Sequence, residues 1–146
     1  MRRPFLSAAV ALLAMFIVAS ASAADVVWSA LVMATNRGDS TPPPAELDKV
    51  QATLKRFFNY NQYEVIGQSR QTLATGDEDW QTSSKYFSLH VDAKPAAKSA
   101  YRLNLQLFQE QKLLLETEAN LSKRRPLVIR GPQVGDGQLV LLLMVE

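Results

Sequence analysis

The sequence contains no cysteine and only one histidine, His90. A chain without cysteine is not a disulfide-stabilised secreted module, and it carries no lipoprotein anchor on a cysteine. Zinc and copper sites built from histidine and cysteine need several such ligands, which this chain lacks. We therefore predict no metal site and no cofactor.

The chain also lacks an excess of charge of either sign. It has 16 Lys and Arg residues against 14 Asp and Glu residues. Two of the basic residues, Arg2 and Arg3, lie in the N-terminal segment, which leaves 14 basic and 14 acidic residues elsewhere. A nucleic-acid partner requires a broad basic surface, so we predict none. The one local basic run, Lys123-Arg124-Arg125, would suit an anionic surface such as phospholipid headgroups, and a solvated corner is the simpler interpretation.

The N-terminal segment has the three parts of a secretory signal peptide. Two arginines are followed by an unbroken apolar run at residues 8–19 and by small residues (ASASAA) at 19–24. We predict cleavage after Ala23, with Ala21 as the alternative, so that residues 1–23 are the signal peptide and residues 24–146 form one domain. A retained membrane anchor is the other interpretation, but the run is short for a span of about 20 residues. We expect a periplasmic or secreted protein with no membrane span after cleavage, and the absence of cysteine favours a bacterial envelope.

Residues 45–58 have the spacing of an amphipathic helix. Its apolar residues recur at steps of three and four on one face; they are Leu47, Val50, Leu54, Phe57 and Phe58. Acidic residues stand in the first turn and basic residues in the last, as the helix dipole favours. Three prolines precede the helix, and the last of them, Pro44, is suited to be its first residue.

The rest of the chain is predicted to be mostly β-strand. Strand patterns occupy residues 26–34, 63–73, 85–93, 101–108, 113–121 and 138–145, with a short apolar run at 126–132. Residues 74–81 are predicted as a loop that carries Trp80. The run at 138–145 is apolar without alternation, which is typical of a strand buried on both faces.

We therefore predict an α+β fold. It consists of one antiparallel sheet of six to seven strands, curved or sandwich-like, with the N-terminal amphipathic helix packed on it. The alternative is a β-sandwich with the helix at one end.

Few residue groups point to catalysis. His90 and Asp92 share the polar face of one strand, but no G-x-S-x-G motif supplies a nucleophile. Three consecutive carboxylates, Asp77 to Asp79, lack the spacing of a calcium loop. Glu116 and Glu118 are predicted to be surface residues on an outward strand face. We predict no catalytic residue, and a small hydrolase with its site near His90 or the Asp77–Asp79 loop is the alternative.

Five residues are predicted as partner contacts: Arg37, Asp39, Tyr60, Tyr63 and Trp80. The first two belong to an Arg-Gly-Asp-Ser sequence in a turn-like stretch, which raises the possibility of integrin-type adhesion. Every residue of that stretch has a turn-forming character, so we interpret it as an exposed loop. Two tyrosines in polar company are typical of an interaction surface. The sequence thus predicts a non-enzymatic exported domain that binds another envelope or secreted protein or scaffolds an envelope assembly.

Overall fold

A computed structural model describes residues 24–39, 41–97 and 99–146 of the chain. The predicted signal peptide, residues 1–23, lies outside the described residues. The elements are β1 (Asp25–Thr35), η2 (Ala45–Leu47), α1 (Gln51–Phe57), β2 (Gln62–Leu73), β3 (Asp79–Ser83), β4 (Phe87–Ala96), β5 (Ala100–Gln109), β6 (Lys112–Ser122), β7 (Leu127–Val134) and β8 (Gly137–Val145). In the part of the chain described, no helix has the length and apolar character needed to cross a membrane.

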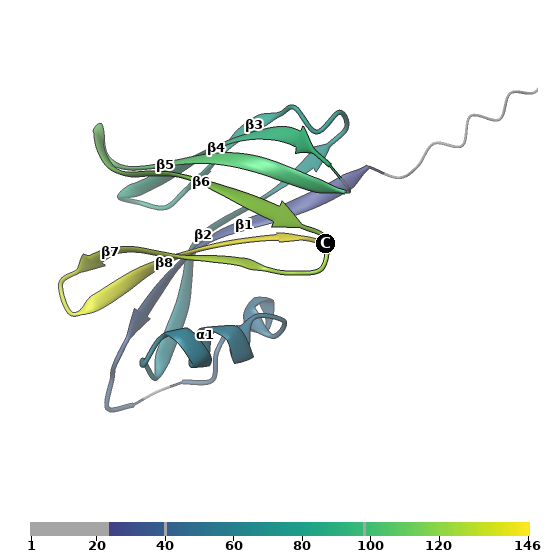
Figure 1. The fold of residues 1–146 in the computed structure, drawn as a ribbon. Coiled ribbons are helices and arrows are strands. Elements are labelled where there is room, and N and C mark those ends of the chain that lie inside the picture. The colour runs from purple at the N-terminus through teal and green to yellow at the C-terminus, as the bar shows by residue number, and fades with distance from the viewer. Residues whose placement is uncertain (1–23, 40, 98) are drawn as a thin grey trace, which may run out of the picture.

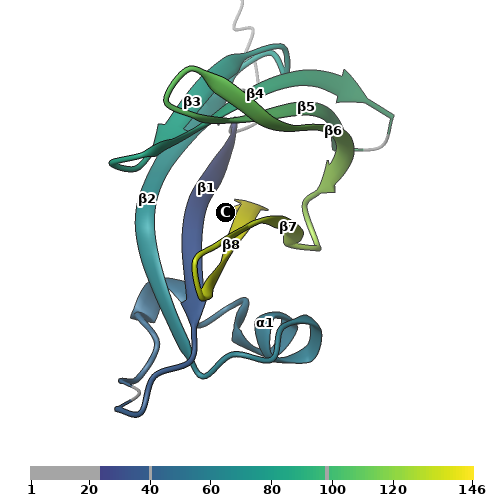
Figure 2. The same ribbon diagram turned by 90° about the vertical axis from the view of Figure 1, so that its left-hand side faces the viewer.

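The eight strands form two antiparallel sheets rather than one. Sheet A has the order β2-β1-β8-β7, and sheet B has the order β3-β4-β5-β6. The two sheets face each other, with the strands of sheet B arching over those of sheet A (Figures 1 and 2). The prediction of an α+β fold with a single sheet of six to seven strands is therefore wrong, and the molecule is a mostly β structure of two layers with one short helix.

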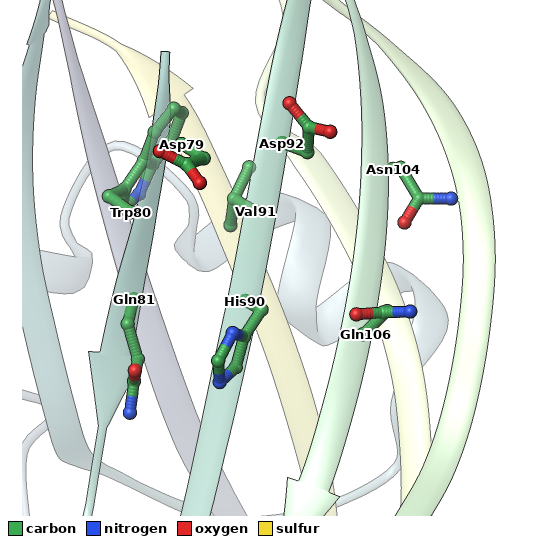
Figure 3. Close-up of a pocket in the computed structure, with 8 residues that line it drawn as sticks. All are labelled: Asp79, Trp80, Gln81, His90, Val91, Asp92, Asn104 and Gln106. Carbon is green, nitrogen blue, oxygen red and sulfur yellow. The ribbon is translucent and has the colours of Figure 1, made fainter.

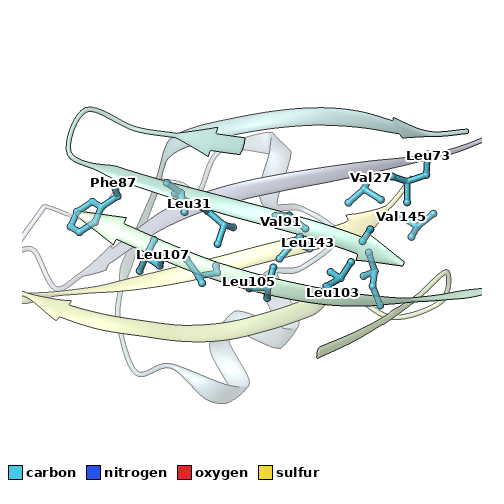
Figure 4. Close-up of a cluster of buried hydrophobic side chains, with 14 of the residues drawn as sticks. Val27, Leu31, Leu73, Phe87, Val91, Leu103, Leu105, Leu107, Leu143 and Val145 are labelled. Carbon is cyan, nitrogen blue, oxygen red and sulfur yellow. The ribbon is translucent and has the colours of Figure 1, made fainter. Parts of the chain in front are cut away.

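The main core lies between the two sheets. Leu31 of β1 and Leu143 of β8 meet Val91 of β4 and Leu105 of β5, and all four side chains are almost fully buried (Figure 4). The alternating apolar residues predicted in β4 and β5 supply the sheet B side of this core. Most outward residues of sheet B are polar, so sheet B has one solvated face.

A second core lies on the other face of sheet A. Trp28 and Val32 of β1 pack there against Leu54 of α1, together with Leu142 of β8. The two central strands of sheet A are therefore buried on both faces, which explains their nearly continuous apolar sequences. The prediction of a doubly buried C-terminal strand is confirmed, since β8 lies between β1 and β7.

The helical segment is shorter than predicted. Only Gln51–Phe57 is α-helical, and residues 45–47 form a single 3₁₀ turn. Val50 interrupts the predicted helix with φ −116° and ψ 0°, and this break lets Leu47 and Val50 both reach the second core. Phe58 is buried, but Phe57, which was predicted on the same face, is 60% exposed. Arg130 of β7 holds the end of the helix, since its guanidinium donates to the Phe57 carbonyl at 3.2 Å.

Strand β3 was predicted as part of a loop. Its inward positions are occupied by Trp80 and by a polar residue, Thr82, so its sequence has no apolar alternation. Thr82 is nevertheless fully buried, because its hydroxyl is hydrogen-bonded to the Ser69 hydroxyl of β2 at 2.6 Å. The buried position is therefore satisfied by a tertiary hydrogen bond rather than by an apolar side chain, so the sequence shows no strand pattern here.

The two flanks of the sandwich differ. On one flank β2 leads into β3, and Gly67 lies so close to the Ser83 carbonyl that an added Cβ would collide with it. On the other flank the chain crosses from β6 to β7, and no backbone ladder joins the two sheets on either flank. We refer to the flank along β6 and β7 as the open flank, because several of its apolar side chains are only partly buried.

Candidate functional site

A depression of about 510 Å³ lies on the outer face of sheet B (Figure 3). Two rows of polar side chains cross three neighbouring strands there. The rows are Gln81, His90 and Gln106, and Asp79, Asp92 and Asn104. The surface is open and hydrophilic, as expected for the solvated face of a sandwich.

His90 lies in this depression without the partners of a catalytic histidine. Its ring meets Phe108 edge-on at a centroid distance of 5.1 Å. Among the described residues it forms no side-chain hydrogen bond, and Figure 3 shows its ring apart from the Asp92 carboxylate. The hydroxyl of the nearby Ser88 accepts a hydrogen bond from the Gln81 amide instead. The base–orienter pair that nucleophilic catalysis needs is therefore not assembled here.

The acidic loop before β3 is engaged with its own backbone. Glu78 accepts hydrogen bonds from the N–H groups of Ala74, Thr75 and Gly76. These bonds lower the pKa of the Glu78 carboxyl, and the bond from the Thr75 N–H has the largest effect. Asp77 forms an ion pair with Lys94 at 2.8 Å. In the described chain no group of three or more His, Asp or Glu side chains is arranged to hold a metal ion.

The Arg-Gly-Asp stretch lies on a segment that is fastened at both ends. Before it, the Arg37 N–H donates to the Asn61 side chain, whose amide in turn donates to the Arg37 carbonyl. After it, Thr41 exchanges two hydrogen bonds with the Gln62 side chain. Arg37 and Asp39 are exposed, as predicted for a loop. However, Gly38 has open space around it and does not adopt a positive φ, so this position has no need of glycine.

The three aromatic residues predicted as partner contacts are partly or wholly inside the molecule. Tyr63 is buried, and its hydroxyl donates to the carbonyls of Leu54 and Phe58 at the end of α1. Burial raises the pKa of Tyr63. Trp80 points between the sheets and donates from its indole N–H to the Ser29 hydroxyl at 3.0 Å. Tyr60 is half-buried beside Pro42 and Pro43 in a depression of about 580 Å³. The structure thus gathers Arg37, Asp39, Tyr60 and Tyr63 at one end of the molecule and places Trp80 elsewhere.

Three of the four sheet edges carry features that hinder the addition of another strand. The edge strand β3 has only five residues. The edge strand β7 is irregular between Arg130 and Gln133. It also contains Pro132, and proline has no backbone N–H. The edge strand β2 has a bulge opposite Leu31 and Val32 and meets the turn at Ser83. Short strands, bulges and prolines are the usual protections of sheet edges.

The edge of β6 lacks these protections over most of its length. After one bulge near its hairpin turn, β6 pairs regularly with β5 from Leu115 to Ser122. It contains no proline or glycine. Its last residue, Ser122, is bridged by the Arg125 N–H, but none of its backbone groups is paired with a described residue of β7. This leaves about half of the backbone N–H and C=O groups of this stretch pointing away from the sheet.

The open flank beside β6 also exposes apolar surface. Several side chains there pack against the main core but are only partly buried: Leu114, Leu115 and Ala119 of β6, and Leu127, Ile129 and Val134 of β7. On the outer face of the same strand, Glu116 accepts hydrogen bonds from two amides of β5, and Glu118 is exposed. An unpaired backbone edge, a half-covered apolar flank and two carboxylates therefore lie together.

This surface was not predicted. Residues 113–121 were correctly predicted as a strand, but nothing local in their sequence says that no further strand follows in the sheet. That fact depends on the order of strands in sheet B, which is a tertiary property. In comparisons with protein-family models, with curated proteins and with solved structures, nothing matches this chain.

Proposed function

We propose that the protein is a non-enzymatic exported domain that binds an extended segment of another envelope or secreted protein along β6. The observation that carries the proposal is the regular, unpaired edge of β6 next to half-buried apolar side chains. An extended peptide that joins a sheet edge gains backbone hydrogen bonds along its length, and pockets for alternate side chains give specificity.

The surroundings of β6 define the chemistry of the partner segment. Side chains on one face of an added strand would cover Leu115, Ala119 and the β7 side of the flank, so these should be apolar. Side chains on its other face would stand beside Glu116 and Glu118, so these should be basic. Cross-strand pairs of opposite charge stabilise a sheet and like charges destabilise it. The proposed partner segment therefore alternates apolar and basic residues.

A synthetic peptide tests this directly. The probe is a fluorescent peptide of about ten residues in which valine and lysine alternate, and its matched control alternates valine and glutamate. Fluorescence anisotropy with the purified protein should show tighter binding of the lysine peptide, with an affinity that falls as salt is added. A third peptide with a central proline should bind poorly, because proline removes a backbone donor.

Two variants of the protein locate the binding. Thr117→Lys places a charged side chain at the inward-facing, half-buried position on β6, and inward-pointing charges block edge association. We expect it to weaken binding about tenfold or more, which corresponds to roughly 1.4 kcal/mol. Thr72→Lys makes the same change at an exposed position on β2 and should leave the affinity unchanged. If both variants bind the peptide as the unmodified protein does, β6 is not the binding edge.

A further inference from the structure

A further depression, of about 440 Å³, lies at the corner where β6 leads towards β7. Its lining consists only of hydroxyl-bearing and basic residues: Ser99, Ser122, Lys123, Arg124 and Arg125. No acidic side chain lines it. This composition differs from that of four other depressions on the described surface, which contain carboxylates or aromatic rings.

The backbone brings these residues together from two separate turns. Ser99 lies in the turn between β4 and β5 with a φ of 62°, and its neighbour Ala100 pairs with Ser122. The Arg125 N–H in turn approaches the Ser122 carbonyl at 3.5 Å, so Lys123 and Arg124 lie at the tip of a tight turn. The positions of the basic groups therefore follow from hairpin pairing rather than from a mobile tail.

Most of the positive charge at this corner is uncompensated within the molecule. Lys123 lies 3.5 Å from the Asp25 carboxylate at the start of β1, which partly neutralises it. Among the described residues neither Arg124 nor Arg125 forms an ion pair, and both are exposed. Guanidinium groups bind phosphate oxygens through paired hydrogen bonds, and serine hydroxyls add further donors.

We propose that this depression binds the phosphate group of an anionic lipid headgroup and so attaches the protein to a membrane surface. The volume exceeds that of a single phosphate and leaves room for an attached headgroup. The lining supplies only hydroxyl and cationic groups, which complement a negatively charged headgroup. The attachment is independent of strand addition along β6.

Vesicle co-sedimentation of the full chain tests the proposal. The probes are vesicles of phosphatidylcholine alone and vesicles in which about 30% is replaced by phosphatidylglycerol. The protein should prefer the anionic vesicles, and the double variant Arg124→Gln/Arg125→Gln should lose about 10- to 30-fold in affinity for them. The matched control Lys55→Gln/Arg56→Gln removes the same charge from the end of α1 and should keep the preference. Any binding through the apolar run is common to both vesicle types and to all variants.

Three outcomes would overturn the proposal. Equal losses in the two double variants would show only a general charge attraction. The absence of any preference for anionic vesicles would exclude an anionic lipid as the ligand. The binding of inorganic phosphate can be measured from the amide shifts of Ser99 and Arg124 in NMR spectra. Tight phosphate binding without a preference for anionic vesicles would assign the depression to a free anion. The variant Thr117→Lys should bind vesicles normally, which separates this result from the test of the β6 edge.

Discussion

Replacement of Gly67 by alanine tests whether the two sheets are held together along β2 and β3. An ideal Cβ at this position would overlap the Ser83 carbonyl oxygen and lie 3.2 Å from the Ser84 nitrogen. These neighbours are backbone atoms of a turn that is itself closed by hydrogen bonds between Ser84 and Phe87. The turn therefore has little freedom to move away, and the collision must be relieved by separating the two sheets at this point.

The expected cost follows from these contacts. Overpacking in a fixed environment costs about 1–3 kcal/mol, and the lower entropy of an unfolded chain with alanine offsets up to about 1 kcal/mol. We expect Gly67→Ala to lower the free energy of unfolding by about 1–2 kcal/mol, which is roughly 4–8 °C in Tm for a domain of this size. Gly38→Ala is the matched control, because Gly38 has open space and no positive φ.

Urea unfolding followed by tryptophan fluorescence measures this difference. Trp28 is 2% exposed and Trp80 points between the sheets, so both report on the packing of sheet A and its neighbours. Gly38→Ala should unfold at the same urea concentration as the unmodified protein or slightly above it. Equal midpoints for Gly67→Ala and Gly38→Ala would refute the close approach of β2 to the β3–β4 turn.

Three further predictions concern polar groups. Burial, together with the hydrogen bond that its hydroxyl donates to Asp25, raises the pKa of Tyr101 to about 12, so the folded protein should lose stability as the pH rises from about 10 towards 12. In an ultraviolet titration of phenolate, Asp25→Asn should lower this pKa while leaving it above the ordinary value, and an unchanged titration would contradict the pairing. The lowered pKa of Glu78 gives stability that is present above the ordinary carboxyl pKa and is lost as the pH falls through the folded value. Glu78→Gln should therefore flatten the acid limb of a pH–stability curve and speed amide exchange in the preceding turn. Protected turn amides in that variant would count against this capping role. Thr82→Val should lower the free energy of unfolding by about 1–2 kcal/mol because it leaves the Ser69 hydroxyl without its partner. In urea unfolding, the double variant with Ser69→Ala should recover part of that loss. If the losses of the two single variants simply add in the double variant, the two hydroxyls do not share a hydrogen bond.

Much of the secondary structure was predictable because the relevant signals are local. The alternation of apolar and polar residues in β4 and β5 reflects one buried and one solvated face, and the apolar run of β8 reflects two buried faces. Each pattern depends only on burial, which a strand records in its own sequence.

The arrangement of the strands was not predictable in the same way. Antiparallel strands that divide into two sheets have the same local patterns as strands in one curved sheet. The division here depends on the corner at Gly67 and on the buried pair of Ser69 and Thr82, which are contacts between segments. Strand β3 escaped prediction for the same reason, because a buried hydroxyl looks polar in the sequence.

The candidate site shows the same limit. Tyr63 and Trp80 have the composition of contact residues, but the structure uses their polar atoms inside the molecule. The edge of β6 and the corner at Ser99 and Ser122 depend on which strands are neighbours. Local sequence identifies the residue types at these surfaces, and only the register of the hairpins brings them together.

Residue-resolved amide hydrogen exchange is the most direct test of strand addition along β6. The purified protein is compared with and without the alternating valine–lysine peptide. Strand addition predicts new protection at alternate amides between Leu115 and Ser122, which point away from the sheet in the free protein. It predicts little change along β2, β3 or β7. Protection that appears at another edge, or a bound peptide that protects no amide of β6, would contradict the account.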